Sequence, residues 1–225
     1  MGMSLLYEVL EPLPDAHAAL ARARGLLAEF ADYAEPPYSP DLGPVVTADQ
    51  FRHSLRYFSR GWFTPRSGGP FPPEGLPEFW ALLHRTNTLL GGDTYAVEVA
   101  LHPDMADLWP LIEAWELELQ LPFAVTPPFA RTTEDGCTEE ELDAMVAALG
   151  PLGFDVAWYA DLRGLPSTKL CGVHLALNSA WTSQCTEPAP GSHAVYLSVG
   201  TRNHATQDAW LAATGLRLGP PLTGW

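Results

Sequence analysis

The stretch TEEELDAMVAALGPLGFDVAWYA, residues 138–160, decides the fold class. It opens with a capping box, in which the hydroxyl of Thr138 and the carboxylate of Glu141 cap the first turn of a helix. Apolar residues then recur at helical spacing as far as Gly150, and the run from 154 to 161 alternates as a half-buried strand does. A helix followed directly by a strand predicts a chain that mixes both kinds of element.

Periodicity outside this stretch predicts further helices and strands. Helices are expected near 14–33, 49–60, 77–90, 103–120 and 206–214, and strands near 94–101, 121–126, 169–178 and 193–200. This order predicts an α+β fold, with N-terminal helices packed on a mixed sheet of about five strands and a C-terminal helix. A single domain over 1–225 is expected. The alternative is an N-terminal helical subdomain at 1–66, bounded by the Pro- and Gly-rich loop 64–77.

The charge balance limits the classes of partner. Among 225 residues, 27 are acidic and 12 are basic, which gives a net charge of −15. A field of that sign repels nucleic acid and anionic lipid, so neither is expected as a partner, and it favours a basic protein. The sequence holds no apolar run of membrane-spanning length and no secretory signal pattern, and its three cysteines are an odd count. We therefore expect a cytoplasmic protein with reduced thiols and no membrane association.

The acidic excess is greatest in residues 101–150, where tryptophans accompany the carboxylates. Carboxylates in a first helical turn are stabilised by the helix dipole, which explains part of this excess. The rest predicts either a solvated face or a surface that binds a basic partner. The predicted partner-binding residues are Glu113, Glu116, Glu118, Glu139, Glu140, Glu141, Trp109 and Trp115. The function predicted first is an acidic, cytoplasmic protein-binding domain that neutralises a basic partner, by the physics that bacterial immunity proteins and nuclease inhibitors use.

A row of arginines supports a second hypothesis, a small-molecule enzyme or ligand-binding domain. Arg52, Arg56 and Arg60 recur every four residues, and their guanidinium groups could hold an anionic ligand while His53 or His174 moves protons. The sequence contains no phosphate-binding loop, zinc-protease or nucleophile-elbow motif. An enzyme is still compatible with these absences, because catalytic groups are often assembled from distant positions.

The group most similar to a metal site consists of Cys171, His174, Cys185 and His193. On a strand near 169–178, however, Cys171 and His174 differ by three positions and point to opposite faces. We therefore predict no metal and no cofactor. A thiol nucleophile would have to be Cys137, Cys171 or Cys185, and buried or idle cysteines are the more common case.

Overall fold

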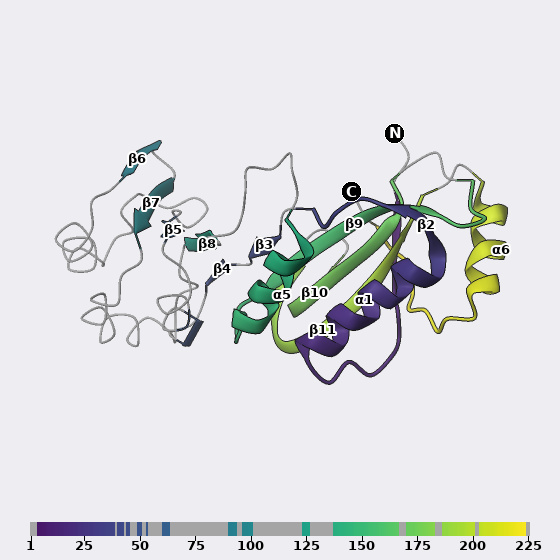
Figure 1. Ribbon diagram of the computed structural model, residues 1–225, viewed down its shortest axis with the longest axis horizontal. Coiled ribbons are helices and arrows are strands. Elements are labelled where there is room, and N and C mark those ends of the chain that lie inside the picture. The colour runs from purple at the N-terminus through teal and green to yellow at the C-terminus, as the bar shows by residue number, and fades with distance from the viewer. Residues whose placement is uncertain are drawn as a thin grey trace. The chain divides into compact units, whose positions relative to one another are not determined.

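The computed structural model (Figure 1) describes residues 4–38, 40–42, 44–45, 49–50, 53, 60–63, 90–93, 96–100, 123–126, 137–166, 170–182, 186–200 and 203–223. The chain forms two compact units. The first consists of Met1–Asp41, Ala130–Ala147 and Gly153–Trp225, and the second of Leu42–Phe129 and Ala148–Leu152. A single domain stays a prediction, and the loop 64–77 lies outside the described residues.

The first unit is built on an antiparallel sheet with the strand order β12-β1-β11-β10-β9-β2. Its strands are β1 (Leu5–Glu8), β2 (Ala31–Ala34), β9 (Phe154–Leu162), β10 (Gly172–Trp181), β11 (Thr186–Val199) and β12 (Leu222–Thr223), and β3 (Asp41–Leu42) also pairs with β9. Each neighbouring pair along this order is antiparallel, so the expected mixed sheet was wrong. Short connections join β9, β10 and β11 in sequence, and such connections allow only antiparallel pairing. The α+β class itself is consistent with this architecture.

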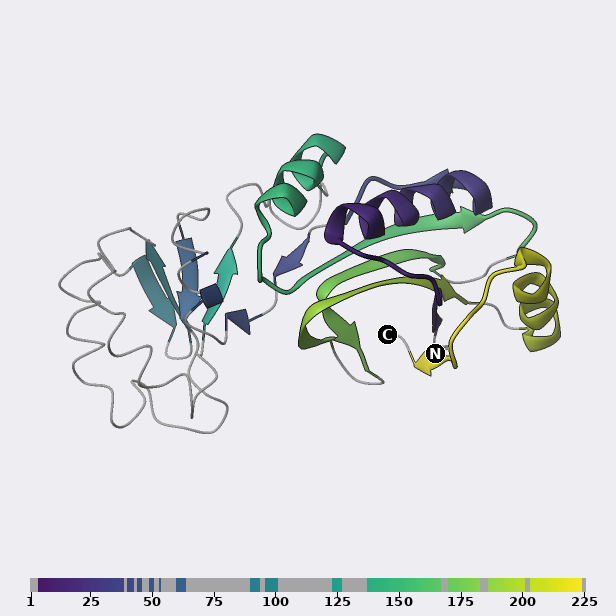
Figure 2. The same ribbon diagram turned by 90° about the horizontal axis from the view of Figure 1, so that it is seen from below.

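Buried apolar residues lie on both faces of this sheet. One face holds a cluster of Leu6, Ala176, Ala194 and Tyr196, and the helices cover the other face. Alternation along β9 and β10 puts Phe154, Trp158 and Leu175 on that face, and all three are buried. Two helices, α1 (Ala16–Phe30) and α5 (Glu139–Ala148), cover the same face, as Figure 2 shows. Burial of their apolar sides against the strands is the main stabilising contribution to this unit.

Local sequence explains where both helices begin. The Asp15 side chain accepts a hydrogen bond from the Ala18 backbone N–H at 2.8 Å, and α1 then buries Leu20 and Leu26. At α5 the predicted capping box is confirmed. The Thr138 N–H donates to Glu141 at 2.8 Å, and the Glu141 N–H donates to the Thr138 hydroxyl at 3.1 Å.

Two strands lie where the sequence predicted only helix. Strand β1 pairs Leu5–Glu8 with the end of β11, and β2 begins at Ala31, directly after α1. A run of four residues is too short to show its period, so β1 depends on pairing with a distant segment. The helix predicted near 14–33 therefore ends earlier than expected, and residues 1–66 are not purely helical.

The third described helix, α6 (His204–Thr214), confirms the predicted C-terminal helix. It begins at the Asn203 cap and ends at Gly215, whose φ of 68° is left-handed. The Gln207 side chain donates to the Tyr7 hydroxyl at 2.9 Å, and the Trp210 indole donates to the Arg163 carbonyl at 2.8 Å. These two hydrogen bonds connect α6 to β1 and to the residue that follows β9, within the first unit.

The second unit contains an antiparallel sheet with the order β4-β8-β5-β7-β6. Its strands are β4 (Pro44–Val45), β5 (Arg60–Phe63), β6 (Leu90–Asp93), β7 (Ala96–Ala100) and β8 (Phe123–Thr126). Strands β7 and β8 confirm the strands predicted near 94–101 and 121–126. The predicted helix 103–120 and most of 77–90 lie outside the described residues. Across the part of the chain that the structure describes, no helix is long and apolar enough to span a membrane.

Candidate functional site

Two of the predicted partner-binding glutamates on α5 have partners inside the chain. Glu139 pairs with Arg24 of α1 and accepts a hydrogen bond from the indole of Trp158 at 3.3 Å. Glu141 belongs to the capping box. Glu140 is exposed. The acidic helix start therefore stabilises the fold through Glu139 and Glu141, which leaves Glu140 as its outward-facing carboxylate among these three.

The remaining predicted partner-binding residues, Glu113, Glu116, Glu118, Trp109 and Trp115, lie outside the described residues. Arg52 and Arg56 of the second hypothesis do as well. Arg60 belongs to strand β5, so the arginine row does not continue along a helix as the sequence predicted. Strand pairing with β7 and β8 overrides the four-residue spacing there.

The two histidines of the second hypothesis lie in different units. His53, in the second unit, makes a short hydrogen bond through Nε2 to the Ala148 carbonyl. His174 lies on β10 in the first unit, where the ring of Trp181 meets it edge-on at 5.8 Å between centroids. Burial lowers the pKa of His174 to about 4, so the imidazole is neutral near pH 7 and holds no proton to donate.

The residues considered for zinc are separated by the sheet. His174 pairs with Tyr196 and Leu177 pairs with His193, so alternation places the two histidines on opposite faces. The Cys171 sulfur is buried, where it accepts a hydrogen bond from the Gly200 N–H at 3.2 Å. Cys185 lies outside the described residues. Among those described, no three His, Cys, Asp or Glu side chains are grouped so that they could hold a metal ion.

The thiol of Cys137 is also a poor nucleophile. Its side chain is buried, and burial together with the nearby charges of Glu141 and Glu139 raises the pKa of Cys137 to about 11. A thiol must lose its proton to attack, and near pH 7 this one keeps it. Both cysteines that the structure describes therefore resemble structural residues.

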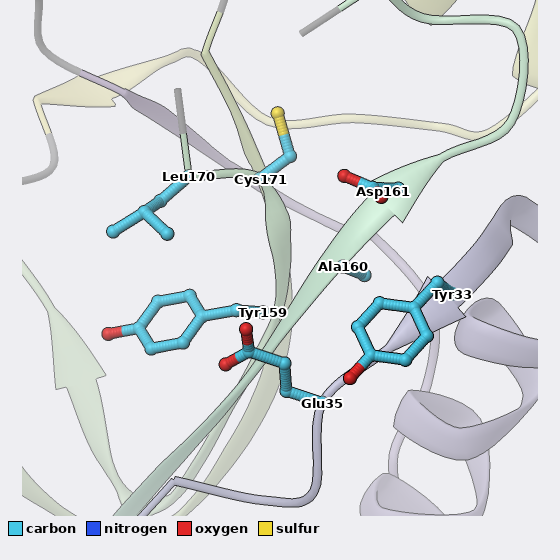
Figure 3. A pocket seen from close by; sticks show the side chains of 7 residues that line it. All are labelled: Tyr33, Glu35, Tyr159, Ala160, Asp161, Leu170 and Cys171. Atoms are coloured by element: carbon cyan, nitrogen blue, oxygen red, sulfur yellow. The ribbon is translucent and has the colours of Figure 1, made fainter. Parts of the chain in front are cut away.

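A pocket at the β2 side of β9 brings together side chains that the sequence did not single out (Figure 3). It has a volume of about 140 Å³ and is open to solvent. We call it the acidic tyrosine pocket, and its lining consists of Tyr33, Glu35, Tyr159, Ala160, Asp161, Leu170 and Cys171. Figure 3 shows the Glu35 carboxylate between the rings of Tyr33 and Tyr159 and the Cys171 thiol pointing away from them.

Strand register explains how these residues come together. Tyr33 of β2 lies opposite Asp161 of β9, and Tyr159 is two residues before Asp161, so the three share one face. The chain beyond β2 continues along β9, because the Glu35 N–H donates to the Tyr159 carbonyl at 2.8 Å. The Tyr38 N–H likewise donates to the Ala157 carbonyl at 2.7 Å. Backbone hydrogen bonds on rigid sheet therefore position the pocket.

Apolar surface is exposed around the pocket. Tyr33 is 60% exposed, Leu170 63% and Tyr38 44%, and the rings of Tyr38 and Tyr159 pack with centroids 5.8 Å apart. These three are among the four large hydrophobic side chains that are exposed within the described part of the chain. Such a concentration of exposed aromatic and aliphatic side chains in one place is typical of a binding surface.

The lining of the pocket carries negative charge, from the carboxylates of Glu35 and Asp161. Within the described residues neither Glu35 nor Asp161 forms an ion pair. Burial, followed by the neighbouring Tyr38 and the Glu35 charge, raises the pKa of Tyr159, so its hydroxyl stays protonated at neutral pH. The pocket therefore presents two carboxylates and aromatic rings, a combination that suits a cation.

A second hollow adjoins the acidic tyrosine pocket and shares Asp161 with it. It is wide and shallow, with a volume of about 490 Å³, and its lining consists of Asp32, Asp161, Leu162, Gly164, Leu165 and Pro166. Asp32 is paired with Arg163 at 2.9 Å in an exposed ion pair. Asp161 thus lines both depressions.

One feature of the sequence could have indicated this site. The run ADYAEPPY, residues 31–38, combines two acidic residues with two tyrosines and two prolines within eight positions. The helix predicted near 14–33 includes the first part of this run, whereas its residues form β2 and the segment that follows. The contribution of Asp161 and Leu170 had no local signal, because they come from β9 and from the segment just before β10.

Comparison with known proteins provides no relative onto which the pocket could be mapped. The functions of Glu35 and Asp161 are therefore inferred from the geometry and charge of the pocket alone. No protein-family model matches the chain, and neither a curated protein nor a solved structure does.

Proposed function

We propose that this chain is an acidic protein-binding domain that binds a basic protein through the acidic tyrosine pocket and the second hollow. The observation that carries the proposal is the pairing of exposed aromatic surface with two carboxylates that form no ion pair within the described residues. Exposed carboxylates alone would be a solvated face. Next to Tyr33 and Leu170, which are more than half exposed, they form a surface that a partner could desolvate.

The size of the depressions favours a protein over a free small molecule. Sites for small molecules usually enclose roughly 300–1,000 Å³ and bury most of the ligand. The acidic tyrosine pocket, at about 140 Å³, is smaller, and the second hollow is wide and shallow. The two adjoining depressions could accept two neighbouring side chains from the surface of a partner protein. Tyrosines such as those in the pocket are common among the residues that contribute most to the binding energy of protein interfaces.

The charge of the whole chain supports a basic partner. A net charge of −15 produces a field that speeds the encounter with a positively charged protein and slows it with an acidic one. Neutralisation of that partner, in the manner of an immunity or inhibitor protein, is part of the proposal. The glutamates at 113, 116, 118 and 140 would then contribute mainly to this long-range field.

The enzyme or small-molecule hypothesis has less support from the described residues. His174 is neutral near pH 7 and is covered by Trp181, so it is not poised to exchange protons. Among the described residues that line the pocket in Figure 3 there are two carboxylates and no arginine. Arg52 and Arg56, on which the hypothesis depends, lie outside the described residues.

A comparison of two variants with equal charge tests the proposal. The double variant Glu35→Gln, Asp161→Asn removes two charges from the pocket, and Glu140→Gln, Glu187→Gln removes two exposed charges elsewhere. Each protein is immobilised and exposed to a lysate of its source organism at low and at high salt. We expect the wild type and the second variant to retain the same basic protein at low salt, and the first variant to lose it.

The outcome that contradicts the proposal is equally specific. If both double variants retain the basic protein as the wild type does, the pocket is not the binding surface. If no basic protein is retained by the wild type at low salt, binding of a basic partner is refuted.

A further inference from the structure

We propose that the acidic tyrosine pocket selects an arginine side chain of the partner in preference to a lysine. This inference rests on the proposed function and adds the identity of the side chain that the pocket recognises. It follows from how Tyr33, Tyr159, Glu35 and Asp161 are arranged around the cavity.

The lining offers two kinds of surface that a guanidinium group uses together. Its flat faces stack on aromatic rings, and its edge carries N–H donors in a fixed fork that matches a carboxylate. In Figure 3 the rings of Tyr33 and Tyr159 flank the carboxylate of Glu35, and Asp161 lies across the pocket on β9. A planar cation against one of these rings could therefore stack on it and donate to a carboxylate at once.

A lysine ammonium group would use this lining less completely. It has no flat face, and it is a compact and strongly hydrated charge that loses more on leaving water. It could donate to Glu35 or to Asp161, but contact with the rings would be limited to its methylene groups. The aromatic walls are thus the part of the pocket that distinguishes arginine from lysine.

The size of the pocket and its apolar rim fit the same side chain. A volume of 140 Å³ corresponds to about four or five water molecules at roughly 30 Å³ each, which is the scale of one side-chain head. Leu170 at the rim is 63% exposed, and the methylene stem of an arginine could cover it. Cys171 and Ala160, which are buried, complete the lining of the pocket.

The test uses two peptides of equal charge, fluorescein-labelled hexa-arginine and hexa-lysine, titrated with the full chain at low salt and followed by fluorescence anisotropy. We expect the wild type to bind hexa-arginine about three- to tenfold more tightly, the range that a partly exposed cation–π contact provides. Tyr33→Leu should bring the two affinities within about twofold of each other. Tyr33→Phe keeps the ring and should keep the preference.

Tyr33 is 60% exposed, so neither substitution is expected to prevent folding, and far-UV circular dichroism confirms this. The pair Glu35→Gln, Asp161→Asn should weaken binding of both peptides. Equal affinity of the wild type for the two peptides, or a preference that survives Tyr33→Leu, would overturn the arginine inference while salt-sensitive binding still supports a basic partner. Failure of both peptides to bind at low salt would overturn the proposed function as well.

Discussion

Removal of the Glu139 side chain is the perturbation that best separates a structural role from a recognition role at the start of α5. Glu139 pairs with Arg24, accepts from the indole of Trp158, and lies in the first turn of the helix. Glu140, its neighbour, is exposed and serves as the control position. The two substitutions to compare are therefore Glu139→Ala and Glu140→Ala.

The magnitude follows from the partners that Glu139 would leave behind. Its ion pair with Arg24 is partly exposed, so solvent screening limits its contribution to about 0.2–1 kcal/mol. Trp158 is buried, and an unpaired indole N–H there costs about 1–3 kcal/mol. We expect Glu139→Ala to lower the free energy of unfolding by about 2 kcal/mol, and Glu140→Ala to change it by less than about 0.5 kcal/mol.

Urea unfolding followed by far-UV circular dichroism measures both values. Glu139→Gln refines the result, because the amide oxygen can still accept from Trp158 while the charge is lost, so its cost should be about half that of Glu139→Ala. In an Arg24→Ala background the cost of Glu139→Ala should shrink by the part due to the ion pair. Equal and small effects at positions 139 and 140 would refute the internal role assigned to Glu139.

Three further predictions concern the core, the pH dependence and the thiols of the first unit. Leu26 is fully buried on α1, so Leu26→Ala should lower the free energy of unfolding by about 2–5 kcal/mol in the same urea assay, and a loss below about 1 kcal/mol would show that α1 does not pack as described. The pKa of His174 is lowered to about 4 in the folded chain, so between about pH 6.5 and 4 the imidazole is protonated in the unfolded chain but not in the folded one. Proton binding then favours unfolding, and the free energy of unfolding should fall as the pH drops through this range. Urea unfolding across this range should show that fall in the wild type and a smaller one in His174→Asn, and identical slopes would contradict the assignment. In a Cys185→Ser background neither Cys137 nor Cys171 should react with a disulfide reagent at about pH 8 until urea unfolds the chain, and rapid reaction of the folded protein would show that these thiols are accessible.

Elements with local causes were predictable from the sequence. The capping box at Thr138 and Glu141 involves residues three positions apart, and the Gly215 stop of α6 is equally local. The alternating runs that became β7 and β9 also carry their period within a few residues. In each case the sequence contained the physical cause of the structure within about one turn or one strand.

The parts that were missed depend on contacts between distant segments. Strand β1 exists because Leu5–Glu8 pairs with β11, nearly two hundred residues later in the chain. The acidic tyrosine pocket joins Tyr33 and Glu35 with Tyr159 and Asp161, which a single sequence does not connect. The hydrogen bond from the Trp158 indole to Glu139 likewise could not be predicted from the run of glutamates. Contacts between distant segments determine these features, and local sequence patterns do not indicate which segments will meet.

The irregularity at Asn178 divides the hairpin of β10 and β11 into two parts that should open at different rates. The register shifts between Leu177 and Ser179, Asn178 has a left-handed φ of 51°, and its side chain accepts from the Gly191 N–H at 3.1 Å. Beyond this point β11 is largely exposed, whereas 194–199 is buried. Amide hydrogens of the outer part should therefore exchange through local opening, while those of the inner part wait for unfolding of the whole unit. Asn178 thus marks where the rigid sheet ends and a hairpin able to fluctuate on its own begins.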